Sequence, residues 1–378
     1  MKLNMDTVRR VGLSVAAPVL AIVLSLVITS IVLAVAGNDP IATVQQMIEY
    51  AQEPRTTTLI INSAITYYFA ALAVAFGFRM NLFNIGVDGQ YRLAALMAAA
   101  VGGAVDLPRV LHVGLILLVA VMVGGLWAAI AGVLKVYRGI SEVISTIMLN
   151  SITTALIAYL LTTDKLAVQA EGSNNIGTPE IPASGRVGGL SLVPDSTLQV
   201  YGLLVLAVIV GFLYWFMIEH SRFGFDLRAT GRNEEAAVAS GVNVKRMVLV
   251  SMAISGGIAG LVGMPQLLGS SYTYSLDFPT GLGFTGIAIA LLGRNTALGV
   301  AIGSLLWGFL DNSSQILDLE GVPKEIVMIT QGVIVLSVVI AYELVRRYRL
   351  VAQQREVGRR LSEPTTPSEP NATQGAQA

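Results

Sequence analysis

The sequence predicts an all-α membrane protein, a bundle of about ten transmembrane helices that is interrupted by broken or re-entrant segments. Of the 378 residues, 54% are hydrophobic and only 13% are charged, whereas a soluble domain carries roughly 25% charged residues. Mean hydropathy is +0.69, and long apolar runs recur along the chain. Two stretches rich in glycine and polar residues, 81–90 and 269–293, interrupt these runs.

Ten apolar segments approach the length of about 20 residues that a span requires. They are 11–36, 59–78, 82–105, 112–134, 143–162, 199–218, 247–268, 281–293, 297–315 and 325–345. The first is longer than the core of a signal peptide, about 7–15 residues, so we expect it to be retained as a helix. The eighth is too short to cross a membrane as a regular helix.

The distribution of Lys and Arg predicts that both termini are cytoplasmic, because inner loops carry an excess of basic residues. With ten spans, the outer side receives Arg55, Arg109, Lys165, Arg186 and Lys324. The inner side receives Lys2, Arg9, Arg10, Arg79, Lys135, Arg138, Arg222, Arg228, Arg232, Lys245, Arg246, Arg294, Arg346, Arg347 and Arg349. A missed span would place many of these basic residues on the opposite side, so the excess of Lys and Arg on the inner side supports the count of ten spans.

The predicted transmembrane domain covers residues 1–350. It includes an outer loop at 163–198, rich in Gly, Pro, Ser and Asn, and a charged inner loop at 219–246. Residues 351–378 end in a stretch with almost no large apolar side chain. Such a segment cannot offset the entropy of ordering, so we expect a disordered cytoplasmic tail.

The first interruption, FNIGVDGQYR, predicts a break inside the membrane. Gly86 and Gly89 interrupt the helical run, and such a break survives only if protein buries it or it lines a cavity. Asp88 is expected to act as N-cap of a helix that starts near Gly89. Arg92 follows four residues later, in the favourable order for an ion pair on a helix.

The second interruption contains Gly281 and Gly283 and gives the chain a break in each half. Spans two to five begin outside and spans seven to ten begin inside, so the two sets are inverted copies by topology. Matching breaks in inverted repeats indicate a substrate site near the midplane of a transporter. The alternative is that both are ordinary turns outside the membrane, with Arg79 and Arg294 marking the inner surface.

The inner loop predicts a short helix on the cytoplasmic side. Asn233 is a plausible N-cap, Glu234 and Glu235 suit the first turn of a helix, and Gly241 ends it. Such a helix offers a small knob to the groove of a partner. A solvated connector helix is the plainer alternative.

Four motifs resemble those of ABC importer permeases, in the group that transports nucleosides, simple sugars and branched-chain amino acids. RNEEAA with SGVN, within residues 232–243, resembles the coupling helix of that group. NLFNIGVDGQ (81–90), SEVISTIMLNSI (141–152) and FTGIAIALLGR (284–294) are similar to its other motifs, and the first favours the nucleoside type. Asp88 stands where that type usually has Glu, and Arg92 where it has a small or apolar residue.

The resemblance, which covers roughly residues 10–345, implies a type II importer fold and a multi-pass subunit of the bacterial inner membrane. It implies three protein partners: a cytoplasmic ATPase that binds ATP and Mg²⁺, an extracytoplasmic binding lipoprotein that delivers nucleosides, and a second permease. A heterodimer is expected and a homodimer is possible. Membrane lipid is a further partner, and a nucleic acid polymer is not expected.

The resemblance and the residue types together assign candidate roles. Flat nucleosides with polar edges suit aromatic walls and a few amide or carboxylate groups. The candidates for the substrate pathway are Phe83, Asn84, Asp88, Gln90, Tyr272, Phe278, Phe284 and Thr285, with Tyr67, Tyr68 and Asn150 as weaker additions. The candidates for contact with the ATPase are Arg232, Asn233, Glu234, Glu235, Ala236, Ala237 and Gly241. An aromatic residue alone is more often packing or an interface anchor.

Three competing hypotheses remain. The same machinery could carry a simple sugar or a branched-chain amino acid, whose charged ends Asp88 and Arg92 could bind. An ion-coupled secondary transporter would need deep carboxylates, and besides Asp88 only Glu142 and Asp311 stand out, near span ends. A membrane enzyme is disfavoured because the chain has no Cys and only two separated His residues. We therefore expect no catalytic residue, metal or cofactor in this chain, which also lacks a P-loop.

Overall fold

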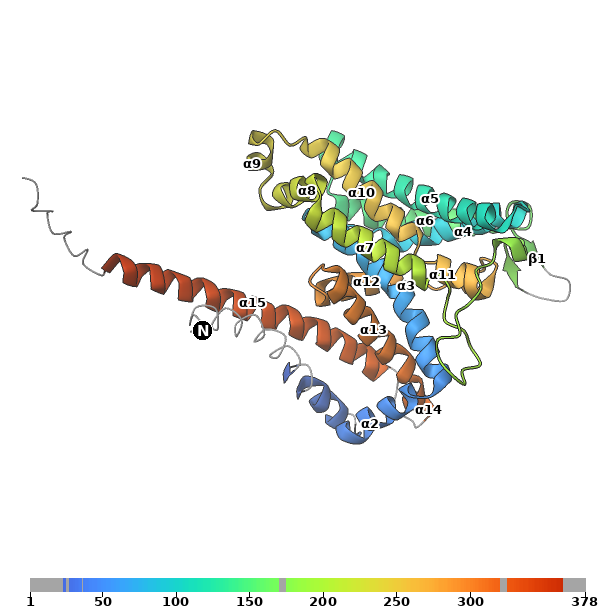
Figure 1. The fold of residues 1–378 in the computed structure, drawn as a ribbon, viewed down its shortest axis with the longest axis horizontal. Helices are drawn as coiled ribbons and strands as arrows, with labels where there is room; N and C mark the ends of the chain where they lie inside the picture. Colours follow the sequence, from blue (N-terminus) through green and yellow to red (C-terminus); the bar gives the residue numbers. More distant parts are fainter. Residues whose placement is uncertain (1–22, 25–26, 36, 170–174, 320–324, 363–378) are drawn as a thin grey trace, which may run out of the picture. The chain divides into compact units, whose positions relative to one another are not determined.

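A computed structural model describes residues 23–24, 27–35, 37–169, 175–319 and 325–362, and this part of the chain is mainly helical (Figure 1). The helices are α2 (Pro40–Ala51), α3 (Pro54–Phe78), α4 (Val87–Ala104), α5 (Arg109–Arg138), α6 (Glu142–Leu160), η1 (Ala183–Gly185), α7 (Leu204–His220), α8 (Arg222–Arg232), α9 (Glu234–Ala239), α10 (Val244–Gly260), α11 (Met264–Gln266), η2 (Leu267–Ser271), α12 (Leu282–Leu292), α13 (Ala297–Ser313), α14 (Gln315–Leu319) and α15 (Glu325–Ser362). Two short strands, β1 (Val168–Gln169) and β2 (Ile176–Gly177), pair antiparallel in the outer loop, with Val168 opposite Gly177.

The chain divides into two units. Residues 29–335 form the larger unit, which contains every candidate site residue discussed below, and residues 1–28 with 336–378 form the other. The described part of the smaller unit consists mainly of α15 beyond Val335.

The helices confirm a multi-pass membrane protein. Four of them are long and apolar enough to cross a membrane: α3, α5, α6 and the continuous stretch Val244–Ser271, and two bent pairs of helices raise the number to six. One bent pair is α7 with α8, at an angle of 69°, and α12 belongs to a class of shorter apolar helices. Ten spans and the type II arrangement stay predictions.

Predicted and observed helices agree closely between residues 54 and 313. The predicted segment 82–105 begins five residues before α4 because the chain is irregular as far as Gly86. The predicted first span, 11–36, falls mainly outside the described residues. Helix α2 was not predicted. Asp39 caps it by accepting from the amides of Ile41 and Ala42, and Pro40 suits its first turn.

The C-terminal prediction differs from the structure over residues 351–362. These residues continue α15 to Ser362, and Gln, Arg, Glu and Leu, which make up much of this stretch, are good helix formers. The remainder of the predicted disordered tail, 363–378, lies outside the described residues. The boundary at residue 350 therefore stays a prediction.

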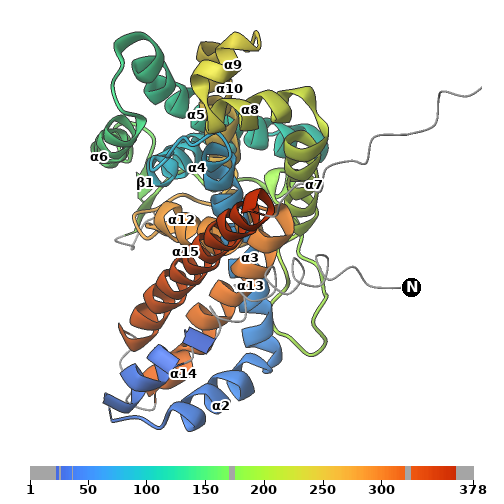
Figure 2. The same cartoon turned by 90° about the vertical axis from the view of Figure 1, so that its left-hand side faces the viewer.

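Small residues let the helices of the larger unit pack closely. A Cβ atom on Gly124 of α5 would lie 2.9 Å from the backbone nitrogen of Gly260 on α10, so this pair of helices requires glycine where it crosses. Helix α3 is buried continuously from Phe69 to Phe76 and contacts α10, α12 and α13. Figures 1 and 2 show α3 between these helices. Close backbone approach through small residues is the usual packing device in membranes, where the hydrophobic effect cannot drive helices together.

Candidate functional site

The first irregular segment, residues 79–86, is bound to the protein through its backbone. The amide of Phe83 donates to Glu142 Oε1 at 3.3 Å, and the carbonyl of Ile85 accepts from Asn150 Nδ2 at 2.9 Å. The amide of Gly89, in the first turn of α4, donates to Asn150 Oδ1 at 2.9 Å. Helix α6 thus supplies the partners that a non-helical backbone needs in a membrane.

Two buried amide side chains fix the segment from within. Asn84 and Gln90 exchange hydrogen bonds of 2.9 and 2.8 Å, and both are at most 1% exposed. Asn84 Oδ1 also accepts from the amide of Gly86 at 3.1 Å, while its Nδ2 donates to Ser255 on α10 at 2.9 Å. The side-chain amide of Asn84 therefore makes its hydrogen bonds within the protein, and it acts as a structural clamp on the first irregular segment.

The second irregular segment, residues 272–281, is bound by the outer loop. The amides of Thr178 and Ile181 donate to the carbonyls of Tyr274 and Tyr272, both at 2.9 Å, and the amide of Tyr274 donates to the hydroxyl of Thr178 at 3.0 Å. The guanidinium of Arg186 lies over the ring of Tyr272, 4.3 Å from its centroid. The outer loop therefore supplies hydrogen-bond partners to the backbone of the second irregular segment, as α6 does for the first.

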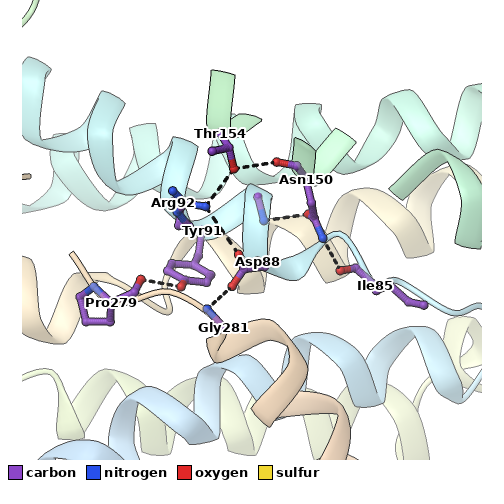
Figure 3. Close-up of polar contacts among 9 residues, drawn as sticks. Ile85, Asp88, Tyr91, Arg92, Asn150, Thr154, Pro279 and Gly281 are labelled. Carbon is purple, nitrogen blue, oxygen red and sulfur yellow. Dashed lines mark hydrogen bonds and ion pairs between the residues drawn. The ribbon is translucent and has the colours of Figure 1, made fainter. Parts of the chain in front are cut away.

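The two irregular segments meet at the first turn of α4. Asp88 Oδ1 accepts from the amide of Gly281 at 2.7 Å, and the hydroxyl of Tyr91 donates to the carbonyl of Pro279 at 2.7 Å (Figure 3). Gly283 packs against the same turn so closely that a Cβ atom would lie 2.5 Å from the amide nitrogen of Asp88. Residues that are about 190 positions apart in sequence thus form one contact.

The predicted ion pair between Asp88 and Arg92 is confirmed. Asp88 Oδ2 lies 3.8 Å from Arg92 Nη1, and the two side chains are 11% and 16% exposed. Arg92 also donates to the hydroxyl of Thr154 on α6 at 3.2 Å (Figure 3). Both charges are therefore engaged with the protein itself.

The structure corrects the predicted roles of Asp88 and of two glycines. Asp88 is not an N-cap: Gly86 holds that position, without a side-chain cap, and the carboxylate contacts Gly281 instead. Gly89 and Gly283 do not interrupt helices, because they lie in the first turns of α4 and α12. They permit close contacts, since a Cβ on Gly89 would lie 2.8 Å from Asn150 Oδ1.

The remaining pathway candidates separate into exposed and buried residues. Phe83 and Phe284 are 44% and 56% exposed, and Thr285 is partly exposed, whereas Phe278 is buried against Tyr274 with their ring centroids 4.7 Å apart. Of the weaker candidates, Tyr67 donates to Asp311 at 2.6 Å. Tyr68 packs against Gly211 on α7.

Two cavities in the larger unit have walls that are almost wholly apolar. The larger, about 500 Å³, lies between α5, α7 and α10, and the other, about 250 Å³, lies between α3, α7 and α13. Neither suits a nucleoside, whose polar edges would lose their hydrogen bonds there. Among the described residues, no three side chains of the metal-binding types come together.

The inner loop folds as predicted. Helix α9 begins after Asn233, whose side chain accepts from the amide of Ala236 at 2.9 Å, with Glu234 and Glu235 in the first turn. Gly241 follows the helix with a φ of +84°, a conformation that favours glycine. Most of the candidate residues there are exposed, but Ala237 is 2% exposed, so it packs inward and cannot contact an ATPase in this conformation.

Several residues that hold the site were not predicted for these roles. Ser255 and Glu142 contact the first segment from other helices, and Thr178 contacts the second from the outer loop. A polar residue in an apolar run signals a partner, but the sequence does not identify that partner when it is far along the chain.

Known proteins share most of this chain. Residues 56–339 match the model of the family described as branched-chain amino acid transport system / permease component. A guanosine ABC transporter permease of Bacillus subtilis is 39% identical over 280 residues, which cover 74% of this chain and 79% of the relative. A glucose ABC transporter permease of Haloferax volcanii is 31% identical over 90% of this chain and 91% of its own. A nucleoside ABC transporter permease of Lactococcus lactis is 27% identical over 85% of this chain and 90% of its own. No solved structure matches.

Proposed function

Because the chain belongs to the permease family of the branched-chain amino acid transport system, we propose that it moves nucleosides across the membrane for an ABC importer. It is the membrane-spanning permease subunit of that importer, and its relatives include guanosine and nucleoside permeases. An ATPase and an extracytoplasmic binding protein are its partners, since importers of this family work with both.

The chain is not an enzyme in this proposal. ATP and Mg²⁺ bind the partner ATPase, whose closure moves α9 and the inner loop. The binding protein is a lipoprotein, the termini are cytoplasmic, and the membrane is the bacterial inner membrane with its lipids around ten spans. No nucleic acid polymer takes part.

The lengths of the helices support an intramembrane position for the joined segments. Val244–Ser271 has 28 residues, about 42 Å at 1.5 Å per residue, which exceeds the roughly 30 Å of hydrocarbon. Helix α12 has 11 residues, or about 17 Å, so on its return it crosses only about half of the hydrocarbon. In this topology the second segment descends from the outer surface and meets the first near the midplane, which Asp88 and Gly281 mark.

Two kinds of residue serve the pathway. Asn84, Asp88 and Gln90 hold its wall, because their polar groups are engaged within the chain. Phe83, Phe284 and Thr285 are accessible and contact the passing nucleoside, and Tyr272 and Phe278 shape the second segment. The two cavities described above are apolar and do not suit a nucleoside, and in this proposal a second permease completes the pathway. A related but different chain is our first choice for that partner, and an identical copy is the alternative.

The contacts of Asp88 and Arg92 disfavour an amino acid as the cargo. An amino acid needs a cation and an anion to bind its ends, but these two side chains bind each other, Gly281 and Thr154. A sugar stays the second candidate, because the glucose permease matches 90% of the chain. An ion-coupled transporter would need a carboxylate free to change partners, whereas Asp88, Glu142 and Asp311 are all engaged.

Reconstitution into liposomes with the ATPase and the binding protein tests the proposal. We expect ATP-dependent uptake of radiolabelled guanosine that exceeds uptake of glucose, ribose and leucine at equal concentration. A complex with a hydrolysis-deficient ATPase is the control. Uptake driven by a proton or sodium gradient without ATP would contradict the proposal, and a preference for glucose would replace the nucleoside by a sugar.

A further inference from the structure

A charged network joins three helices at the inner end of the larger unit, and Glu219 lies at its centre. Glu219, the penultimate residue of α7, places Oε1 3.3 Å from Arg79 Nη2 and Oε2 3.7 Å from Arg228 Nη1. Arg79 follows α3 and begins the first irregular segment, while Arg228 lies on α8. One carboxylate therefore bridges the inner loop and the first segment.

Arg79 extends the network to the second half of the chain. Its Nε donates to the carbonyl of Asn295 at 2.9 Å, and the hydroxyl of Tyr214 on α7 donates to the same carbonyl at 2.7 Å. Asn295 lies in the turn between α12 and α13 and has a φ of +54°, an unusual conformation for a residue other than glycine. The inner end of α12, whose outer end touches Asp88, is thus held by the same arginine.

Helix α8 also rests directly on the first segment. A Cβ atom on Gly231 would lie 2.9 Å from the carbonyl oxygen of Arg79 and 2.9 Å from the Cα of Met80, so only glycine permits this approach. Leu227 is fully buried, and the ring of Phe223 stacks on Phe76 of α3 with centroids 6.3 Å apart.

Helix α8 is joined to α9 without a flexible linker. Asn233 ends α8 and caps α9. Helix α8 contacts both α7 and α9, and the three helices are neighbours in Figures 1 and 2. A displacement of α9 is therefore passed to α8, and from α8 to the residues around Arg79.

We propose that Glu219 is the positioning residue that makes α8, the first irregular segment and the inner end of α12 move together when the ATPase displaces α9. The inference rests on the proposed function. Ion pairs this exposed, with Glu219 at 40%, contribute little to stability. The contribution of Glu219 is therefore geometric, and it should appear as a change in coupling between ATP hydrolysis and transport.

The test uses the reconstituted complex of permease, ATPase and binding protein. Co-purification of the ATPase, ATP hydrolysis and guanosine uptake are measured for the wild type, Glu219→Gln, Glu219→Asp and a control, Asp226→Asn. The control removes one negative charge from α8 outside this network. We expect Glu219→Gln to keep ATPase binding and to hydrolyse ATP within about twofold of the wild type, while guanosine transported per ATP falls about tenfold. Glu219→Asp should restore at least half of that ratio, and Asp226→Asn should keep it.

Gly231→Ala supplies a second route if Glu219→Gln fails to assemble, because the added methyl group pushes α8 from Arg79 without changing charge. The same fall in guanosine per ATP is expected. An unchanged ratio in the assembled variant, a parallel loss of hydrolysis and uptake, or no recovery in Glu219→Asp would overturn the inference. A wild-type complex without ATP-driven uptake would overturn the proposed function itself, and the inference with it.

Discussion

Replacing Asp88 by Asn removes a nearly buried charge from the point where the two irregular segments meet. At the 3.8 Å that separates Asp88 from Arg92, two unit charges attract by about 4 kcal/mol at an effective dielectric constant of about 20. Asn can still accept from the amide of Gly281, so the main loss is the counter-charge of Arg92. We expect Asp88→Asn to lower the free energy of unfolding by about 3 kcal/mol, as removal of one partner of a buried pair does.

A double-mutant cycle measures this interaction. Arg92→Gln should be destabilising alone, and the double variant Asp88→Asn with Arg92→Gln should be about 2 kcal/mol more stable than the sum of the single effects predicts. Unfolding in mixed detergent micelles, followed by circular dichroism, gives the free energies. The exposed pair Glu180–Arg186, whose side chains are 63% and 33% exposed, is the matched control and should couple by less than about 1 kcal/mol. Additive effects of the Asp88 and Arg92 substitutions would refute the reasoning.

Asp88→Asn should also reduce guanosine uptake while the complex still assembles.

Three further tests concern other parts of the protein. Gly283→Ala should destabilise the protein by about 1–3 kcal/mol in the same unfolding assay, because the methyl group overlaps the first turn of α4. Gly114→Ala on α5 is the control and should not destabilise the protein, because a Cβ there meets no atom within 4 Å. Asn84→Ala should reduce guanosine uptake at least tenfold without loss of ATPase binding, since it removes the clamp of the first segment; unchanged uptake would separate Asn84 from transport. Glu234→Lys with Glu235→Lys should abolish ATPase co-purification or uncouple hydrolysis from uptake while the outer half stays folded, and normal transport with a bound ATPase would contradict the assignment of α9.

The sequence predicts local structure here better than it predicts contacts. Asn233, the acidic residues after it and Gly241 are close enough in sequence to define α9, and the structure confirms that helix. The spacing of Asp88 and Arg92 likewise defines their pair. In each case the interacting groups lie within one or two helical turns, where the geometry of the helix decides what meets.

The failures share a different cause. Asp88 has the residue type of an N-cap, but the amide of Gly281 competes for its carboxylate from a distant part of the chain. Gly89 and Gly283 were expected to break helices, whereas they admit neighbouring side chains and backbone. A glycine that permits close packing and one that ends a helix are the same letter in the sequence, and only the position of the neighbouring helix distinguishes them.

Cysteine labelling can locate the first irregular segment and the first turn of α12, which directly follows the second segment, in the working transporter. The chain has no Cys, so Phe83→Cys and Phe284→Cys each introduce a single reactive thiol at an accessible position. The reconstituted complex is treated with a membrane-impermeant thiol reagent from either side, with and without ATP and vanadate. We predict that nucleotide trapping changes the side from which each thiol is labelled. Fast labelling of both thiols from the inner side in every state would contradict this account, since both segments would then be turns in cytoplasmic water.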